Sequence, residues 1–153
     1  MFSKEESTRL KQQFWINFGQ YMKPVPSAEG LPINWINYKT GVKHIFFKMD
    51  THAKSATISI QLSHTDFGIR HLIFDQFEAF ETMFGNVMNE EWLWQKDATD
   101  EYGKTVSLIS VTLEHRSFYN PQHWPDLISF FKPRMIALDE FWGDVKPVFE
   151  DLV

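Results

Sequence analysis

The sequence predicts a single α+β domain in which a five-stranded antiparallel or mixed sheet packs against three helices. Apolar residues recur every three or four positions in three segments, as they do on one face of a helix. Between these segments they alternate with polar residues, as they do on one face of a strand. The length of 153 residues is that of one domain, so we expect residues 1–153 to share one core.

The first helix is predicted to begin at Ser3, whose hydroxyl caps it while Glu6 completes a capping box. Pro24 and Pro26 end it, because proline cannot donate a backbone hydrogen bond. Its apolar face consists of Leu10, Phe14, Phe18 and Tyr21.

Three strands are expected next, at residues 33–39, 42–49 and 55–63, with a tight turn at Thr40-Gly41. The third strand alternates most clearly and is predicted to have one buried and one polar face. The apolar positions are Ala56, Ile58, Ile60 and Leu62, and the polar positions are Thr57, Ser59 and Gln61.

A second helix is predicted from Asp66 to the neighbourhood of Gly85, followed by strands at residues 91–97 and 104–114. The last strand is apolar on both faces, so we place it in the centre of the sheet. The helix has its apolar positions at Ile69, Ile73, Phe77, Phe80, Phe84 and Val87.

The last helix begins at Asn120-Pro121, a capping side chain followed by a proline suited to the first turn. Pro133 and Pro147 are expected to kink or divide it. Its apolar stripe consists of Ile128, Phe131, Met135, Leu138, Trp142, Val145 and Phe149.

Four segments of the chain carry a resemblance to a known family. They are Gln13-Phe14-Trp15, residues 35–41 (Trp-Ile-Asn-Tyr-Lys-Thr-Gly), the pair Trp92 and Trp94, and the helix at 124–148. With these segments the chain resembles the DUF4268 family, a bacterial domain of unknown function, over nearly its whole length. Some longer members look like fusions with nuclease-related domains. The resemblance implies the fold rather than a chemistry.

The predicted element order, αβββαββα, also matches the core topology of restriction-endonuclease-like proteins in its first six elements. Those enzymes bind magnesium through acidic side chains on the second and third strands, together with a lysine. Here the third strand offers Thr57, Ser59 and Gln61 instead. We therefore expect no intact nuclease site and no cleavage of DNA, with degenerate nucleic-acid binding left open.

Composition excludes several classes of function. Cysteine is absent, which removes disulfides and thiolate ligation and favours the cytoplasm. No apolar segment is long enough for a membrane span, so no membrane partner is expected. The net charge of −5 disfavours a dedicated nucleic-acid binder without excluding a local basic patch. We expect no cofactor.

The densest mixture of titratable and aromatic groups lies between the last strand and the last helix. We predict a ligand site there, with Arg116 as the cation for an anionic group. The alternative is a polar connection in which an aromatic side chain anchors the helix start. The predicted ligand-binding residues are Glu114, His115, Arg116, His123 and Trp124.

The remaining chemical candidates favour a structural interpretation. Six histidines show no metal-binding spacing, so we expect no metal site and name no catalytic residue. Trp35, Trp92 and Trp94 are expected in the core rather than as stacking platforms. Twenty-five aromatic residues in so short a chain instead suggest a surface for contacts.

Three functions are consistent with these features. The leading hypothesis is a non-catalytic interaction module that forms a homodimer or binds a protein partner. The alternatives are a degenerate nuclease-like protein of DNA processing or defence, and a small-ligand-binding domain with a cleft near Arg116.

Overall fold

The computed structural model describes residues 2–152, which form four α-helices, four strands and one short 3-10 helix. The α+β class is confirmed, but the order is αββααββα rather than αβββαββα. The elements are α1 (Lys4–Met22), β1 (Ile45–Thr51), β2 (Ser55–Leu62), α2 (Phe67–Ala79), α3 (Glu81–Met88), β3 (Leu93–Thr99), β4 (Thr105–Glu114), η1 (Pro121–His123) and α4 (Trp124–Glu150).

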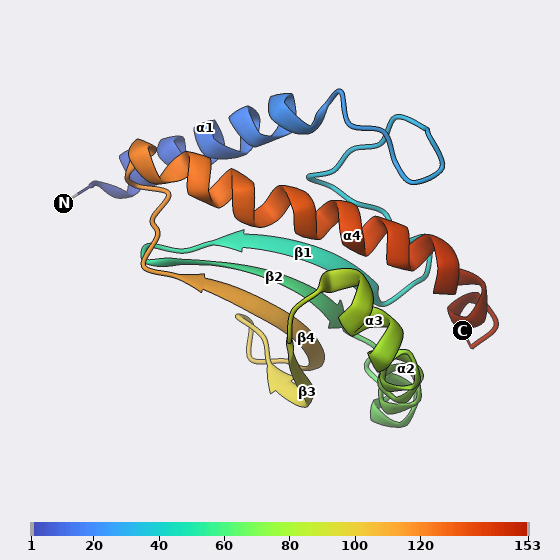
Figure 1. Ribbon diagram of the computed structural model, residues 1–153. Helices are drawn as coiled ribbons and strands as arrows, with labels where there is room; N and C mark the ends of the chain where they lie inside the picture. Colours follow the sequence, from blue (N-terminus) through green and yellow to red (C-terminus); the bar gives the residue numbers. More distant parts are fainter. Residues whose placement is uncertain (1, 153) are drawn as a thin grey trace.

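The sheet is fully antiparallel, with the strand order β1-β2-β4-β3 (Figure 1). Strand β4 pairs with β2 on one side and β3 on the other, so the prediction that this strand is central is confirmed. Directly paired residues lie on the same face of a sheet, and Phe47, Ile60 and Ile109 continue one apolar row across three strands.

The prediction of a strand at residues 33–39 is wrong, because this segment is a loop. Oδ1 of Asn34 accepts hydrogen bonds from the backbone N–H groups of Ile36 and Asn37, at 3.1 Å each, which closes the backbone into a turn. The indole N–H of Trp35 donates to the carbonyl of Val25 at 2.9 Å. These local bonds replace the expected hairpin. Without that strand, the element order no longer matches a restriction-endonuclease-like core.

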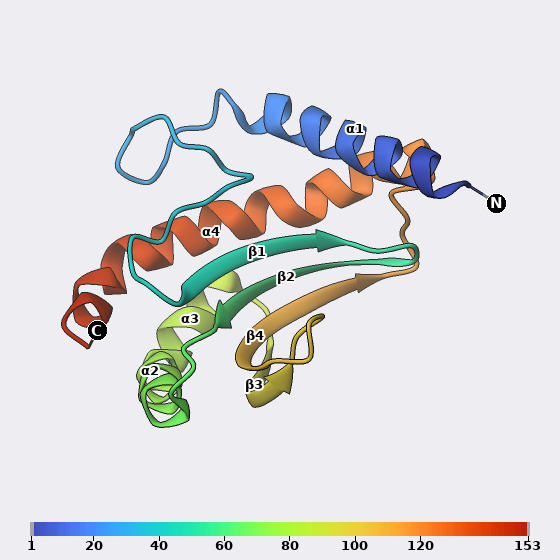
Figure 2. The ribbon, with the colours of Figure 1, turned by 180° about the vertical axis from the view of Figure 1, so that it is seen from behind.

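Helices α1 and α4 lie along the same face of the sheet, as the two ribbon views show (Figures 1 and 2). Strand β2 turns its apolar side chains to this face, and Ala56, Ile58, Ile60 and Leu62 are fully buried. Thr57 and Gln61 point the other way and stay partly exposed. The predicted separation into an apolar and a polar face is therefore confirmed, except that Ser59 on the polar face is buried. Along β1 and β2, no helix of residues 2–152 covers the polar face (Figure 2).

Helix α1 begins and ends where the sequence predicts. Oγ of Ser3 accepts a hydrogen bond from the backbone N–H of Glu6 at 3.1 Å, and the helix ends at Met22. Phe14 and Phe18 are fully buried. Tyr21, expected on this face, is 52% exposed, and Met22 is buried in its place because four-residue steps continue the stripe that faces the core.

The second predicted helix is divided into α2 and α3. Asp66 caps α2 by accepting a hydrogen bond from the N–H of Ile69 at 3.0 Å. At Phe80 the backbone leaves the helical region, with φ −99° and ψ 11°. Phe77 and Phe84 lie on either side of Phe80 in the predicted stripe, and the change of direction lets both bury their rings against α4.

Helix α4 runs unbroken for 27 residues through Pro133 and Pro147, so the expected division into segments does not occur. Both prolines lie on the exposed side, where water can replace the hydrogen bonds that they remove. The predicted apolar stripe is buried except for Ile128, which is half-buried.

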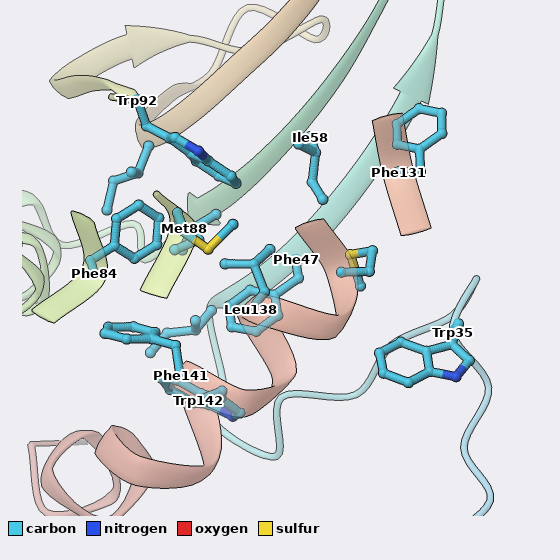
Figure 3. Packing of buried hydrophobic residues seen from close by; sticks show 14 of the residues in the cluster. Trp35, Phe47, Ile58, Phe84, Met88, Trp92, Phe131, Leu138, Phe141 and Trp142 are labelled. Atoms are coloured by element: carbon cyan, nitrogen blue, oxygen red, sulfur yellow. The ribbon is translucent and has the colours of Figure 1, made fainter. Parts of the chain in front are cut away.

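The core is rich in aromatic rings, and its centre lies between the sheet and α4 (Figure 3). Phe84 makes edge-to-face contacts with Trp92 and Phe141, with ring centres 5.1 Å and 5.2 Å apart. Trp35 and Trp92 are buried and Trp94 packs against the core, so the structural role predicted for these tryptophans is confirmed. None of the helices in residues 2–152 has both the length and the apolar character of a membrane span.

Candidate functional site

A cavity of about 390 Å³ lies between the loop of residues 27–40 and the C-terminal half of α4. We call it the Asp139 pocket, after the carboxylate in its wall. Its lining includes Ser27, Glu29, Asn34, Asn37, Tyr38, Lys39, Asp139, Trp142, Gly143 and Lys146. This volume is within the usual range for sites that hold small molecules.

Asp139 is 8% exposed, although it carries a carboxylate. Its Oδ1 accepts a hydrogen bond from the hydroxyl of Tyr38 at 2.6 Å, and its Oδ2 accepts one from the backbone N–H of Ala28 at 2.7 Å. Within residues 2–152 each oxygen thus has one donor, whereas a carboxylate oxygen can accept more than one hydrogen bond. The carboxylate holds the loop onto α4 and keeps the capacity to accept a further donor.

Tyr38 is held in a fixed position by its ring and by its hydroxyl. The ring stacks on Phe47 of β1 with centres 5.2 Å apart. Burial, followed by the hydrogen bond to Asp139 and its charge, raises the pKa of Tyr38 well above the usual range. Tyr38 therefore remains a neutral donor toward the carboxylate across the physiological pH range.

A lysine approaches the pocket where the chain has a glycine. Gly41 adopts a positive φ of 79°, which favours glycine, and a Cβ built on it would stand 2.6 Å from Nζ of Lys146. The absence of a side chain at Gly41 thus lets the ammonium of Lys146 lie against the loop. The pocket therefore combines one carboxylate and one ammonium on the same stretch of α4.

The ligand site predicted between β4 and α4 forms a network of internal bonds. Nε of Arg116 donates to Oδ2 of Asp126 at 2.7 Å, and its Nη1 donates to the carbonyl of His115 at 2.9 Å. Nδ1 of His123 accepts a hydrogen bond from the N–H of Ser117 at 3.0 Å, and the indole N–H of Trp124 donates to a backbone carbonyl. The structure thus brings Arg116, His123 and Trp124 together in a connection whose polar groups bond to nearby side chains and backbone groups.

Glu114 is exposed at the end of β4, and none of the five predicted residues lines the Asp139 pocket. Among residues 2–152 there is no group of three or more His, Asp or Glu side chains arranged to hold a metal ion. The rings of His44 and His64 do lie close together, with centres 4.4 Å apart and planes tilted by 58°.

The sequence pattern does not identify Asp139 as a site residue. A signal was present, because Asp139 follows Leu138 on the buried side of a regular apolar stripe and charged residues are seldom buried without a partner. Its partners Tyr38 and Ala28 are 101 and 111 residues away in the sequence, so the pattern could not identify them.

Comparison with known proteins identifies a family. The DUF4268 family, described as a domain of unknown function, matches residues 10–146. No curated protein and no solved structure matches the chain. The matched region includes every strand, the loop of the Asp139 pocket and Lys146, the last residue in its lining. The chain therefore belongs to the DUF4268 family.

Proposed function

We propose that this protein is a non-catalytic binding domain that holds a small zwitterionic molecule, such as a free amino acid, in the Asp139 pocket. The observation that carries the proposal is the carboxylate of Asp139, which is nine-tenths buried in a cavity wall with one donor on each oxygen. An ammonium group of a ligand supplies the missing donor and a compensating charge.

The opposite end of such a ligand has partners in the same lining. Lys146 places an ammonium against the loop at Gly41, and the exposed Lys39 adds a second cation. Trp142 and Tyr38 contribute aromatic walls. One buried acceptor with two cations nearby complements an amine and a carboxylate on one small molecule.

A glycine inside α4 lies in the lining of the pocket. Glycine in a helix costs about 0.5–1 kcal/mol relative to alanine, so a packing reason is expected where it occurs. A Cβ built on Gly143 meets nothing within 4 Å, and Gly143 lines the pocket. In addition, Pro147 has no N–H for the carbonyl of Gly143, which leaves another acceptor near the site. Gly143 is exposed and lines the pocket, so a larger side chain at this position has room to extend into it.

The test is to fill that space by replacing Gly143 with phenylalanine. Thermal unfolding of the wild-type protein is followed with each of the free amino acids at millimolar concentration. A molecule that binds only the folded state raises the melting temperature as its concentration exceeds Kd. We expect at least one amino acid to do so with the wild-type protein and not with Gly143→Phe.

Gly85→Phe is the matched control, because a Cβ on Gly85 also meets nothing within 4 Å and this glycine lies in α3. It should keep the response to the amino acid. If no amino acid stabilises the wild-type protein, or if Gly143→Phe responds as the control does, the proposed function is wrong.

A second candidate is self-association, which one specific observation favours. A groove of about 820 Å³ between α1 and the β1–β2 turn is lined by Trp15, Ile16, Ile36 and Phe118, among others. Ile16 is 60% and Ile36 is 41% exposed, so two aliphatic side chains meet water at its rim. A second copy would cover both residues in a two-fold dimer.

Light scattering from micromolar to millimolar concentration tests this dimer. We expect the molar mass to rise with concentration for the wild-type protein and to stay at the monomer value for Ile16→Glu. A monomer across the whole range for the wild-type protein would contradict self-association. Binding at Arg116 and a nuclease-related role stay predictions from the sequence.

A further inference from the structure

A third cavity, of about 760 Å³, opens on the polar face of the sheet, which α1 and α4 leave uncovered. Its walls come from β1, β2, the start of α2 and the β3–β4 turn. We call it the aromatic groove. It is lined by Phe46, Lys48, Gln61, Ser63, Thr65, Phe67, Arg70, Asp100, Tyr102, Lys104, Thr105 and Val106. It shares no lining residue with the Asp139 pocket.

Three exposed aromatic side chains line this one groove. Tyr102 is 78% and Phe67 is 69% exposed, and they are the two most exposed large hydrophobic side chains in residues 2–152. Phe46 is 45% exposed although it lies within β1. Burial of a ring stabilises a protein, so the fold itself gains little from these three positions. Aromatic rings gathered at one exposed site indicate a surface that meets a ligand.

The turn that presents Tyr102 is held in place by a side chain. Oδ1 of Asp100 accepts hydrogen bonds from the backbone N–H groups of Tyr102 and Lys104, at 2.9 Å each. Gly103 has a positive φ of 79° between them. The ring of Tyr102 and the ammonium-bearing chain of Lys104 therefore project from a defined turn, which lowers the entropy that binding has to overcome.

The charges of the groove are mainly positive, although the chain as a whole carries −5. Nζ of Lys48 lies 6.0 Å from the centre of the Phe46 ring, and Lys104 lines the groove opposite. Neither lysine forms an ion pair within residues 2–152. Arg70 is already paired with Asp97 at 2.7 Å. The two lysines are thus the cations available to an anionic ligand.

We propose that the aromatic groove binds a short segment of single-stranded nucleic acid. Bases stack on the rings of Phe67 and Tyr102, and the phosphates lie against Lys48 and Lys104. Aromatic faces combined with unpaired lysines suit single-stranded nucleic acid better than they suit an apolar peptide, because such a peptide does not use the cations. In a duplex the base faces are covered by neighbouring bases, so they cannot stack on these rings. Two phosphate contacts give weak binding that depends on salt.

Fluorescence anisotropy with a labelled oligothymidylate of about a dozen nucleotides tests the proposal. We expect saturable binding at low salt that weakens as salt rises, with a logarithmic slope of about 1.4 for two phosphates. Phe67→Ala and Tyr102→Ala should each weaken binding by about tenfold. Changing both Lys48 and Lys104 to Gln should remove most of the salt dependence.

Tyr21→Ala is the matched control, because Tyr21 is 52% exposed and has Nζ of Lys132 at 4.7 Å from its ring centre. This tyrosine and lysine lie on α1 and α4, outside the groove. The control should bind oligothymidylate as the wild-type protein does. The five side chains replaced in these variants are exposed or at the surface, and circular dichroism melts will confirm that each variant folds.

Three results would overturn the proposal. One is the absence of oligothymidylate binding by the wild-type protein at low salt. Another is binding that Phe67→Ala and Tyr102→Ala leave unchanged, or that Tyr21→Ala weakens equally. The third is tighter binding of a duplex of the same length than of the single strand. The Asp139 pocket is separate, so Gly143→Phe should leave oligothymidylate binding intact.

Discussion

Replacing Tyr38 with phenylalanine tests how the loop of the Asp139 pocket is held on α4. The phenol donates to Oδ1 of Asp139 at 2.6 Å, while its ring stacks on Phe47. Phenylalanine keeps the ring and removes only the hydrogen bond. A hydrogen bond to a charged group contributes about 1.5–3 kcal/mol, and Tyr38 is only partly buried. We therefore expect Tyr38→Phe to lower the free energy of unfolding by about 1–2 kcal/mol.

The same variant should change how stability depends on pH. The pKa of Tyr38 is raised from its ordinary value of 10.0, so the folded protein keeps a proton that the unfolded chain loses above about pH 10. This stabilisation is complete below the unfolded pKa and is lost as the pH rises above it. The difference in unfolding free energy between wild type and Tyr38→Phe should therefore shrink between about pH 9 and about pH 11.

Urea denaturation at several pH values measures both effects, with the midpoint expected to fall while the m-value stays constant. Tyr102→Phe is the control, because this tyrosine is 78% exposed and its loss of a hydroxyl should change neither the stability nor its pH dependence. Equal unfolding free energies for Tyr38→Phe and wild type, or a loss that does not shrink at high pH, would refute the reasoning.

Three further predictions follow from the core and from one surface network. Phe131→Ala and Leu138→Ala should each cost about 2–5 kcal/mol, because both side chains are fully buried; losses below about 1 kcal/mol in denaturant melts would remove them from the core. Thr51→Val should stabilise by about 1 kcal/mol in urea titrations, because the buried hydroxyl has no partner within residues 2–152, and a destabilised variant would argue against this. Hydrogen bonds from His71, and to a smaller extent from Arg70, lower the pKa of Asp97. Asp97→Asn should therefore be less stable than the wild-type protein near neutral pH, and this difference should vanish as acid protonates the wild-type carboxyl. A difference in unfolding free energy that stays constant down to about pH 3 would contradict this prediction.

Elements with a strong local signal could be predicted from the sequence. The ends of α1, the start of α2 near Asp66 and the stripe of α4 depend on side chains only a few residues apart. Their hydrogen bonds and packing direction are therefore readable from spacing alone. The alternation of β2 likewise shows which of its faces is buried.

Elements whose conformation is decided by distant contacts could not be predicted. Residues 33–39 have the composition of a strand, but Asn34 bonds to the local backbone and Tyr38 reaches Asp139, 101 residues away. Competing side-chain bonds of this kind override strand propensity. The break at Phe80 has a similar cause, because packing of two rings against α4 decides the direction of α3.

The candidate sites divide in the same way. The group around Arg116 is continuous in sequence, so composition could select it, but only the structure shows that Arg116 pairs with Asp126. The Asp139 pocket unites a loop and a helix that are far apart in the chain. Periodicity reports which face of an element is buried and contains no information on what that face meets.

The sequence by itself determined the α+β class, the resemblance to the DUF4268 family, the central position of β4 and the aromatic core. These properties follow from local spacing and from the apolar content of each segment. Only the tertiary structure decided that four strands form the sheet in residues 2–152, that no helix of this range covers the polar face along β1 and β2, and that Asp139 meets Tyr38 in a pocket. Each of those depends on contacts between distant segments, whose free energy appears only when the chain has folded.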